Sequence, residues 1–331
     1  EPDDRALTHK IDEYIDLSVE AENAGRLQMA RLYMDWVIEE EKKVFGDTYW
    51  GLGNSLMRKA RLHSAVPEYE LAEQCALQAL AVFKASGVKR GYVEPLVKHY
   101  RATAEMARNR FDEAFVLSRE AFAGIRPHLR DAGDVYGDIV TLCLTLCQVK
   151  GTIQEYVDIA TSVGTDCFDG KKLTVSMVYA LWSAVMSLVE QQLYDPAIPL
   201  AEEGMKRVRE DGLQNTLAGA YLGMAYARIL NEIGRFEEAL PLVENVIQTT
   251  QMLNCPDNMS LGQTYWTKGV AEFGLGRYED ALASARKAIV EFEKLAPYVD
   301  QGLWRSYSLK ASAESKMKRY KDALVSLNKV R

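Results

Sequence analysis

An internal repeat with a period of 42 residues constrains the fold of this chain most strongly. The phrase "GRFEEALPLV", which begins at Gly234, is followed 42 residues later by "GRYEDALASA" and after another 42 by "KRYKDALVSL". Earlier copies read "GRLQMARLYM", "PEYELAEQCA", "NRFDEAFVLS", "GTIQEYVDIA" and "QLYDPAIPLA". A fixed period of about 20–50 residues is typical of stacked structural repeats, which bury their apolar faces only against neighbouring repeats.

One position inside the repeat carries a small residue. The aligned residues are Ala30, Ala72, Ala114, Tyr156, Ala197, Ala239, Ala281 and Ala323, in steps of 42 residues with one step of 41. A small side chain kept in register predicts that two helices cross closely there, so that a larger residue would overpack the crossing. The fourth copy departs from the pattern, because Tyr156 replaces Ala and Gly164 follows it. We expect its second helix to be short or irregular.

Each repeat is predicted to be two helices joined by a tight turn. Stretches such as "NTLAGAYLGMAYARILNEIG" place apolar residues at helical spacing, and no alternating pattern indicates a strand. The turn carries a glycine in half of the copies, which suits the left-handed residue that commonly ends a helix; these are Gly25, Gly151, Gly234 and Gly276. Prolines that stop a helix fall between repeats, namely Pro127, Pro256 and Pro297.

These features predict an all-α protein: a right-handed superhelical solenoid of about eight helix-turn-helix repeats that spans residues 1–331 as one domain. The expected repeats are 5–46, 47–88, 89–130, 131–170, 171–213, 214–255, 256–297 and 298–331.

The repeat resembles the tetratricopeptide repeat in its small and aromatic positions, which are Gly269, Gly276, Tyr278, Ala281 and Ala288. The usual period of that family is about 34 residues. The 42-residue spacing resembles a longer variant found in kinesin light chains and in bacterial peptide-sensing and regulatory proteins. Two further features are similar to that variant: proline at Pro199 and Pro241, and the linker-like "EKKVFGDTY". The resemblance implies binding of a protein or peptide in a concave groove lined by the first helix of each repeat.

If the family geometry applies, the groove residues follow one face of each first helix at helical spacing. The candidate binding residues are Asn54, Arg61, His99, Tyr179, Trp182, Met186, Tyr221, Met224, Arg228, Asn231, Gln263, Trp266 and Phe273. The same count makes the eighth repeat polar, with Arg305, Ser308 and Ser312. Aromatic and arginine side chains anchor ligands, methionine adapts its shape, and amides pair with a peptide backbone. The alternative is that the large rings only pack between neighbouring helices.

The sequence carries no pattern that points to catalysis or to a metal site. A phosphate-binding loop, a zinc-protease motif, a nucleophile elbow and a paired C-x-x-C are all missing. The four histidines lie in different repeats, and only His99 falls on the predicted groove face. Cys143 and Cys147 share a helix face, but no further ligands accompany them, so we expect both to pack in the core. We therefore predict a protein that is not an enzyme and that carries no cofactor and no metal.

Bulk composition narrows the partners further. The formal net charge of −7 does not favour nucleic acid, and no apolar run reaches the roughly 18 residues of a membrane span. A composition of 48% hydrophobic and 26% charged residues is that of a folded, soluble chain. No apolar signal segment begins the chain, so we expect a cytoplasmic location. The first residue is Glu1, and we expect the chain to be a piece of a longer protein.

Three functions are compatible with this pattern. The first is an interaction scaffold that binds a peptide or partner segment in its groove. The second is a ligand-sensing regulatory arm of a larger enzyme or transcription regulator. The third is self-assembly, because Leu324, Leu327 and Val330 lack the polar cap that ends most repeat arrays, which makes a second copy of the chain an alternative partner.

Overall fold

The computed structural model describes residues 2–130, 135–253, 258–294 and 300–329. Within these ranges the backbone forms sixteen α-helices and one 3₁₀-helix and no strand, which confirms the predicted all-α fold. The first helices are α1 (Pro2–Asn23), α2 (Leu27–Phe45), α3 (Trp50–Ser64), α4 (Tyr69–Ser86), α5 (Val93–Ala107), α6 (Phe111–Ile125), η1 (Arg126–His128) and α7 (Val135–Lys150). The others are α8 (Ile153–Cys167), α9 (Val175–Glu190), α10 (Tyr194–Glu210), α11 (Leu217–Glu232), α12 (Phe236–Met252), α13 (Asn258–Gly274), α14 (Tyr278–Glu293), α15 (Asp300–Lys316) and α16 (Tyr320–Asn328).

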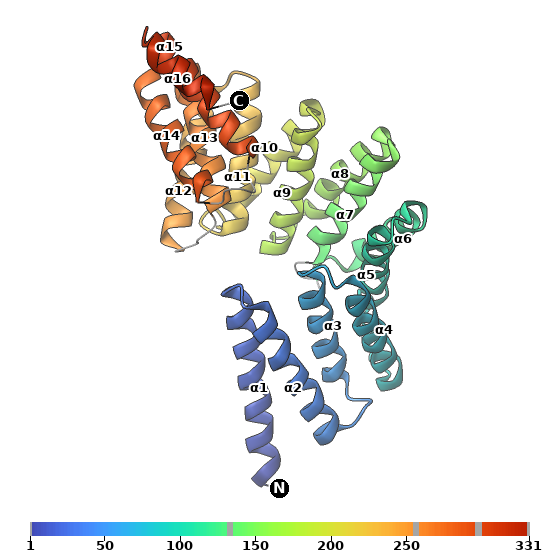
Figure 1. Ribbon diagram of the computed structural model, residues 1–331. Coiled ribbons are helices and arrows are strands. Elements are labelled where there is room, and N and C mark those ends of the chain that lie inside the picture. The colour runs from blue at the N-terminus through green and yellow to red at the C-terminus, as the bar shows by residue number, and fades with distance from the viewer. Residues whose placement is uncertain (1, 131–134, 254–257, 295–299, 330–331) are drawn as a thin grey trace. The chain divides into compact units, whose positions relative to one another are not determined.

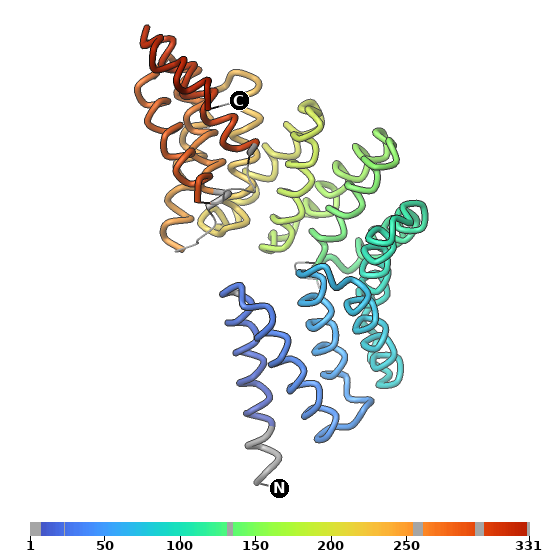
Figure 2. Tube along the Cα trace, in the orientation of Figure 1, coloured from blue at the N-terminus to red at the C-terminus, as the bar shows by residue number. Residues whose placement is uncertain are grey.

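Consecutive helices form hairpins. The pairs α1 and α2, α3 and α4, α5 and α6, α9 and α10, α11 and α12, α13 and α14, and α15 and α16 pack against each other. Figure 1 shows the two helices of these pairs side by side, and the tube in Figure 2 follows the chain from one helix through a short turn into the next. The predicted helix-turn-helix repeat is therefore present.

The chain divides into two compact units, residues 1–156 and 157–331, and the boundary falls within α8. We describe each unit by itself. The extension of one solenoid over the whole chain stays a prediction.

The aligned small residues lie at the helix crossings, as predicted. All eight positions are buried, including Ala239 and Ala281 in the second unit and the exceptional Tyr156 in the first. Around Ala239, the residues Leu230, Val243 and Ala271 form a buried apolar cluster that joins α11, α12 and α13. Because a packed interior tolerates little change in volume, these crossings fix how each hairpin lies on the next.

The turns have the expected left-handed geometry. Gly25, Gly151, Gly234 and Gly276 have φ values of 72°, 70°, 79° and 75°. Three further copies reach the same region without glycine, with φ of 61° at Asn109, 59° at Gln192 and 62° at Lys318. The turn geometry is thus a property of the repeat and not of glycine alone.

The prediction for the fourth repeat was wrong. Helix α8 has 15 residues, as many as α6, and Tyr156 is buried at the crossing. Gly164 lies within the helix, where a Cβ atom would come 2.6 Å from Cδ1 of Leu200 on α10. This glycine therefore permits a close approach of two helices and does not interrupt α8.

The remaining sequence features fall into two groups. Cys143 and Cys147 are buried in α7, which confirms the predicted core packing, and Pro127 lies in η1 after α6 ends. Pro256 and Pro297 lie outside the described residues.

Candidate functional site

The first helices of the 157–331 unit pack on one another in chain order. Helix α9 contacts α11, α11 contacts α13, and α13 contacts α15. Eight half-buried side chains share one face of these four helices, and we call this surface the first-helix face. It consists of Tyr179, Trp182 and Met186 on α9, Tyr221 and Arg228 on α11, Gln263 and Trp266 on α13, and Arg305 on α15.

Three rings on α9 and α11 form an aromatic cluster. The ring centroids of Tyr179 and Trp182 are 6.4 Å apart, those of Tyr179 and Tyr221 are 6.3 Å apart, and those of Trp182 and Tyr221 are 5.5 Å apart. Aromatic pairs at such distances stabilise each other by about 0.5–1.5 kcal/mol beyond the area that they bury. The cluster therefore holds a rigid apolar surface that is half exposed.

The aromatic cluster contains an unsatisfied donor. Nε1 of Trp182 is enclosed and has no hydrogen-bond acceptor among the described residues. A buried donor without an acceptor is costly in a folded protein.

Arg228 continues the face beside the aromatic cluster. Its Nη1 lies 3.5 Å from Sδ of Met186, one turn of α9 beyond Trp182. Burial is the largest cause that lowers the pKa of Arg228, and the positive charge of Arg305 lowers it further. Glu190 acts in the opposite sense, but within the described part of the chain no carboxylate forms an ion pair with Arg228.

Trp266 and Arg305 complete the face on α13 and α15. The guanidinium carbon of Arg305 lies 5.5 Å from the ring centroid of Trp266, which is a cation–π contact. Gln263, one turn before Trp266, is half buried. Phe273 lies at the other end of α13, where its ring packs 5.3 Å from that of Tyr278.

Three predicted groove residues lie inside the helix packing instead. Met224 is 2% exposed and packs with Ala220 and Val246. Asn231 is 8% exposed, and its Nδ2 donates to the carbonyl oxygen of Thr267 at 2.9 Å. Their neighbours Tyr221 and Arg228 on α11 are half buried. Met224 and Asn231 are covered because α12 and α13 pack over their part of α11.

His99 is the third of these residues and belongs to the 1–156 unit. It is 6% exposed, and its Nδ1 has no hydrogen-bond partner in the described residues. Burial lowers the pKa of His99 to about 4. The imidazole is therefore neutral near pH 7 and packs beside Tyr100, with ring centroids 5.3 Å apart.

The other two predicted residues of the 1–156 unit lie on α3. Asn54 is exposed. Arg61 forms an ion pair with Glu22 of α1 at 2.8 Å, and Arg58 forms another with the same carboxylate at 2.8 Å. Arg61 is therefore engaged in holding α3 to α1, which the spacing along one helix does not reveal.

A second aromatic group lies on α1 and α2, and its residues are not among those predicted from the sequence. Tyr14 and Trp36 stack with centroids 4.1 Å apart, and Tyr33 meets Tyr14 edge-on at 5.6 Å. These rings pack against the core cluster around Met34. The repeat could have located Trp36, which lies six residues after the aligned Ala30 on the second helix.

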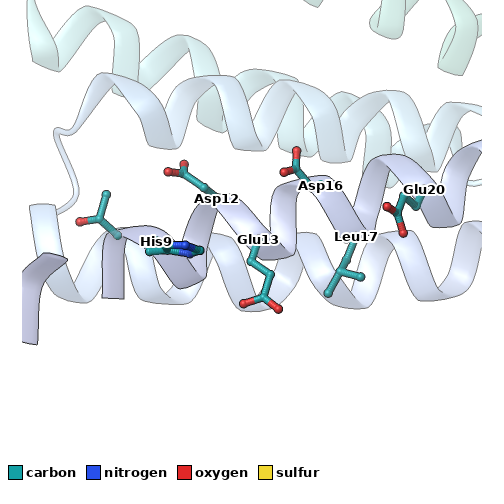
Figure 3. A pocket seen from close by; sticks show the side chains of 7 residues that line it. His9, Asp12, Glu13, Asp16, Leu17 and Glu20 are labelled. Atoms are coloured by element: carbon teal, nitrogen blue, oxygen red, sulfur yellow. The ribbon is translucent and has the colours of Figure 1, made fainter. Parts of the chain in front are cut away.

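An open hollow runs along α1 and is lined mainly by carboxylates. Figure 3 shows Asp12, Glu13, Asp16 and Glu20 along the helix, with His9 at one end. The described residues contain no group of three or more His, Cys, Asp or Glu side chains arranged to hold a metal ion. We assign no ligand to this hollow.

The other three histidines lie on three different elements. His63 Nδ1 is 2.7 Å from Oε2 of Glu68, which also pairs with Arg31. His9 is exposed on α1, and His128 lies in η1.

None of the helices in the described ranges combines the length and the apolar character that a membrane span requires.

Comparisons with known proteins agree on the fold. Neither a protein-family model nor a curated protein sequence matches the chain. Among solved structures, BtubC from P. vanneervenii is similar with a TM-score of 0.56 and 14% identity, over 67% of this chain and 89% of BtubC. The apo form of RapI gives a TM-score of 0.54 with 13% identity, over 97% of this chain and 87% of RapI.

A third similar structure is the apo form of the quorum sensor NprR from B. thuringiensis. Its TM-score is 0.53 at 13% identity, and the match covers 98% of each chain. Together with the helical hairpins described above, these structures show that the chain has the fold of a tetratricopeptide-type repeat protein.

Proposed function

We propose that the 157–331 unit binds a peptide segment of a protein partner on its first-helix face. The observation that carries this proposal is the aromatic cluster, in which three large half-exposed rings from two helices lie within 6.4 Å of one another. Rigid aromatic side chains give large contact area at a low entropic cost and dominate binding hot spots. A folded unit with this surface offers a ready anchor for apolar side chains.

Polar groups beside the rings support a peptide as the ligand. The amide of Gln263 can donate to and accept from a peptide backbone. The face therefore combines apolar anchoring with pairing for a backbone that binding would bury. The mechanism is presentation of a preformed surface, and no reaction is required.

A second candidate is a ligand-sensing regulatory arm. The match to the quorum sensor NprR over 98% of each chain supports it, because a sensor with the same fold couples a ligand to a response. Such an arm would bind its peptide on the same face. It differs from a static scaffold in predicting that the peptide alters backbone protection in residues 1–156.

A peptide-display selection tests the proposed function. The chain is used as bait, and the selection is repeated with Tyr221→Ala and with the control Tyr320→Ala, which removes a 61% exposed ring on α16. We expect a shared peptide motif with wild type and with Tyr320→Ala, and at least a tenfold loss of affinity with Tyr221→Ala. Thermal unfolding of each variant shows whether it is folded. No enrichment with folded wild-type protein, or equal affinity for Tyr221→Ala, would contradict the proposal.

A further inference from the structure

One position of the repeat is exposed in the α15–α16 hairpin and buried in all the other repeats. It is the fourth residue after the aligned small residue on the second helix. In the α15–α16 hairpin this residue is Leu327, which is 48% exposed. In the other repeats it is at most 1% exposed, and its occupants are Met34, Ala76, Ser118, Ala160, Ala201, Val243 and Ala285.

A following first helix helps to bury this position elsewhere in the chain. Met34 of α2 shares a buried apolar cluster with Leu62 of α3, and Val243 of α12 shares one with Ala271 of α13. Among the described residues, α16 packs on α15 and has no helix in the corresponding place. The repeat therefore indicates that a helix has the shape that fits the open side of α16.

The open side of α16 leaves apolar surface in water. Leu324 is 62% exposed, whereas the equivalent Leu282 of α14 is 2% exposed and packs with Ala313 of α15. Leu324 and Leu327 line a hollow of about 560 Å³ beside α15 and α16. Burial of such side chains is a main driving force of association. We call the side that carries Lys321, Leu324 and Leu327 the α16 face.

The charge at one end of the α16 face is reversed relative to other repeats. An acidic residue two places before the aligned small residue pairs there with a basic residue at or just after the C-terminal end of the following first helix. The described residues contain three such pairs, Glu70 with Arg108, Asp112 with Lys150 and Glu279 with Arg319. On α16 the equivalent residue is Lys321, which is exposed. A helix that packs there in the same way therefore requires a carboxylate near its C-terminal end.

A second copy of this chain fits the α16 face poorly. Two α16 faces in contact would bring together Lys321 and the neighbouring Lys316 of both copies, and like charges repel. Helix α1 of a second copy would present Glu13, Asp16 and Glu20, whose equivalents on α5 are buried. Burial of three carboxylates against leucine side chains is costly. These charges favour a helix from a different protein.

We propose that the α16 face binds an amphipathic α-helix of a partner protein. Apolar side chains of the partner helix cover Leu324 and Leu327, and a carboxylate near its C-terminal end pairs with Lys321. This inference goes beyond the proposed function, because the α16 face is separate from the first-helix face.

Selection from a library of helical peptides tests this inference. The probe is a display library of alanine-rich peptides of about 18 residues, a length at which such sequences form helices in water. Positions on one face vary among Ala, Leu, Val and Met, and one position in the last turn is Glu, Gln or Lys. We expect the wild-type chain to enrich peptides with Leu, Val or Met on the varied face and Glu in the last turn.

Two substitutions locate the binding on the α16 face. Leu327→Ser should reduce the affinity for an enriched peptide at least tenfold. Val325→Ser is the matched control and should change it less than twofold, because Val325 is 62% exposed on the same helix and its equivalents Leu32 and Val116 are also exposed, at 59% and 53%. Tyr221→Ala on the first-helix face should leave the affinity unchanged.

Charge reversal tests the predicted carboxylate. Lys321→Glu should shift the preference in the last turn from Glu toward Lys by at least threefold, a modest change because the ion pair is exposed. An unchanged preference for Glu would overturn the assigned pairing with Lys321.

Three outcomes would overturn the α16 site itself. The first is no enrichment by folded wild-type protein, and the second is equal loss of affinity in Leu327→Ser and Val325→Ser. The third is a chain that is dimeric by light scattering and becomes monomeric with Leu327→Ser, because a second copy would then occupy the face. None of these outcomes affects the proposal for the first-helix face.

Discussion

Ser284 Oγ donates a hydrogen bond to Oε2 of Glu272 at 2.6 Å, between α14 and α13. The equivalent pair in the next repeat is the same, since Ser326 Oγ donates to Oε2 of Glu314 at 2.7 Å. All four side chains are buried. Burial is the largest cause that raises the pKa of Glu272, and the hydrogen bond from Ser284 lowers it in part. The two helices of a hairpin are therefore joined by a polar contact as well as by the small residue at the crossing.

Removal of this hydroxyl should destabilise the fold. Ser284→Ala leaves a buried carboxylate oxygen without its donor, and we expect the free energy of unfolding to fall by about 1–3 kcal/mol in urea titration. Ser312→Ala on the exposed side of α15 is the control and should stay within about 0.5 kcal/mol of wild type. Equal effects of the two changes would show that the Ser284 bond contributes nothing.

His99 should make stability depend on pH. Its pKa is lowered by burial from 6.5 to about 4 in the folded protein, so the unfolded chain binds a proton at a higher pH than the folded chain does. The stability that the protein gains by keeping His99 neutral is complete above pH 6.5, and it is lost as the pH falls toward 4. Relative to His99→Gln, wild type should lose about 2–3 kcal/mol between pH 7 and pH 4.5.

Denaturant titration at the two pH values measures this difference, and NMR of the imidazole gives the pKa directly. The His99 resonance should not shift between pH 7 and pH 5. A titration midpoint near 6.5 would contradict a buried, neutral imidazole.

Substitutions at two turn positions should change the stability of the protein in opposite directions. Gly276 has φ of 75°, and Gly276→Ala should cost about 1–2 kcal/mol because a Cβ atom is disfavoured in that conformation. Lys318 occupies the same place in the last repeat with φ of 62°, and Lys318→Gly should relieve this strain, with a gain below about 1 kcal/mol. Thermal unfolding compares the two. A loss of stability in Lys318→Gly would show that its backbone is not strained.

Two glycines within first helices should also respond in opposite directions. A Cβ atom on Gly223 would meet Cε of Met205 at 3.5 Å, an ordinary contact, so Gly223→Ala should gain about 0.5–1 kcal/mol from helix propensity. A Cβ atom on Gly269 would come 2.8 Å from Cδ2 of Leu309 and 3.3 Å from the carbonyl oxygen of Ala281. Gly269→Ala should therefore lose stability, and urea titration measures both. A gain in Gly269→Ala would mean that Leu309 moves aside freely.

The sequence predicted the hairpins and their crossings because these depend on local periodicity. The repeated small residue and the glycine turns need only neighbours along the chain, and both lie where they were expected. The error at α8 has a different origin. Gly164 indicated a break when it was considered within its own helix, whereas its role is to admit Leu200 of α10, a contact across helices that spacing does not contain.

For the candidate site, helical spacing supplies the elements on which the residues lie and not their surroundings. Helical spacing places Trp182, Met224 and Arg228 on the first helices, but it does not show which of them the neighbouring helices cover, and Met224 is buried. Ion pairing is equally non-local. Arg61 is bound to Glu22, whereas Arg228 has no carboxylate partner in the described structure, and nothing in the sequence distinguishes the two arginines.

Hydrogen exchange tests the central claim most directly. Backbone amide exchange would be measured on the whole chain with and without the peptide enriched by display. We expect added protection in α9, α11, α13 and α15, which carry the first-helix face, and little change in α10, α12, α14 and α16. Protection confined to the second helices, or none at saturating peptide, would contradict peptide binding on this face.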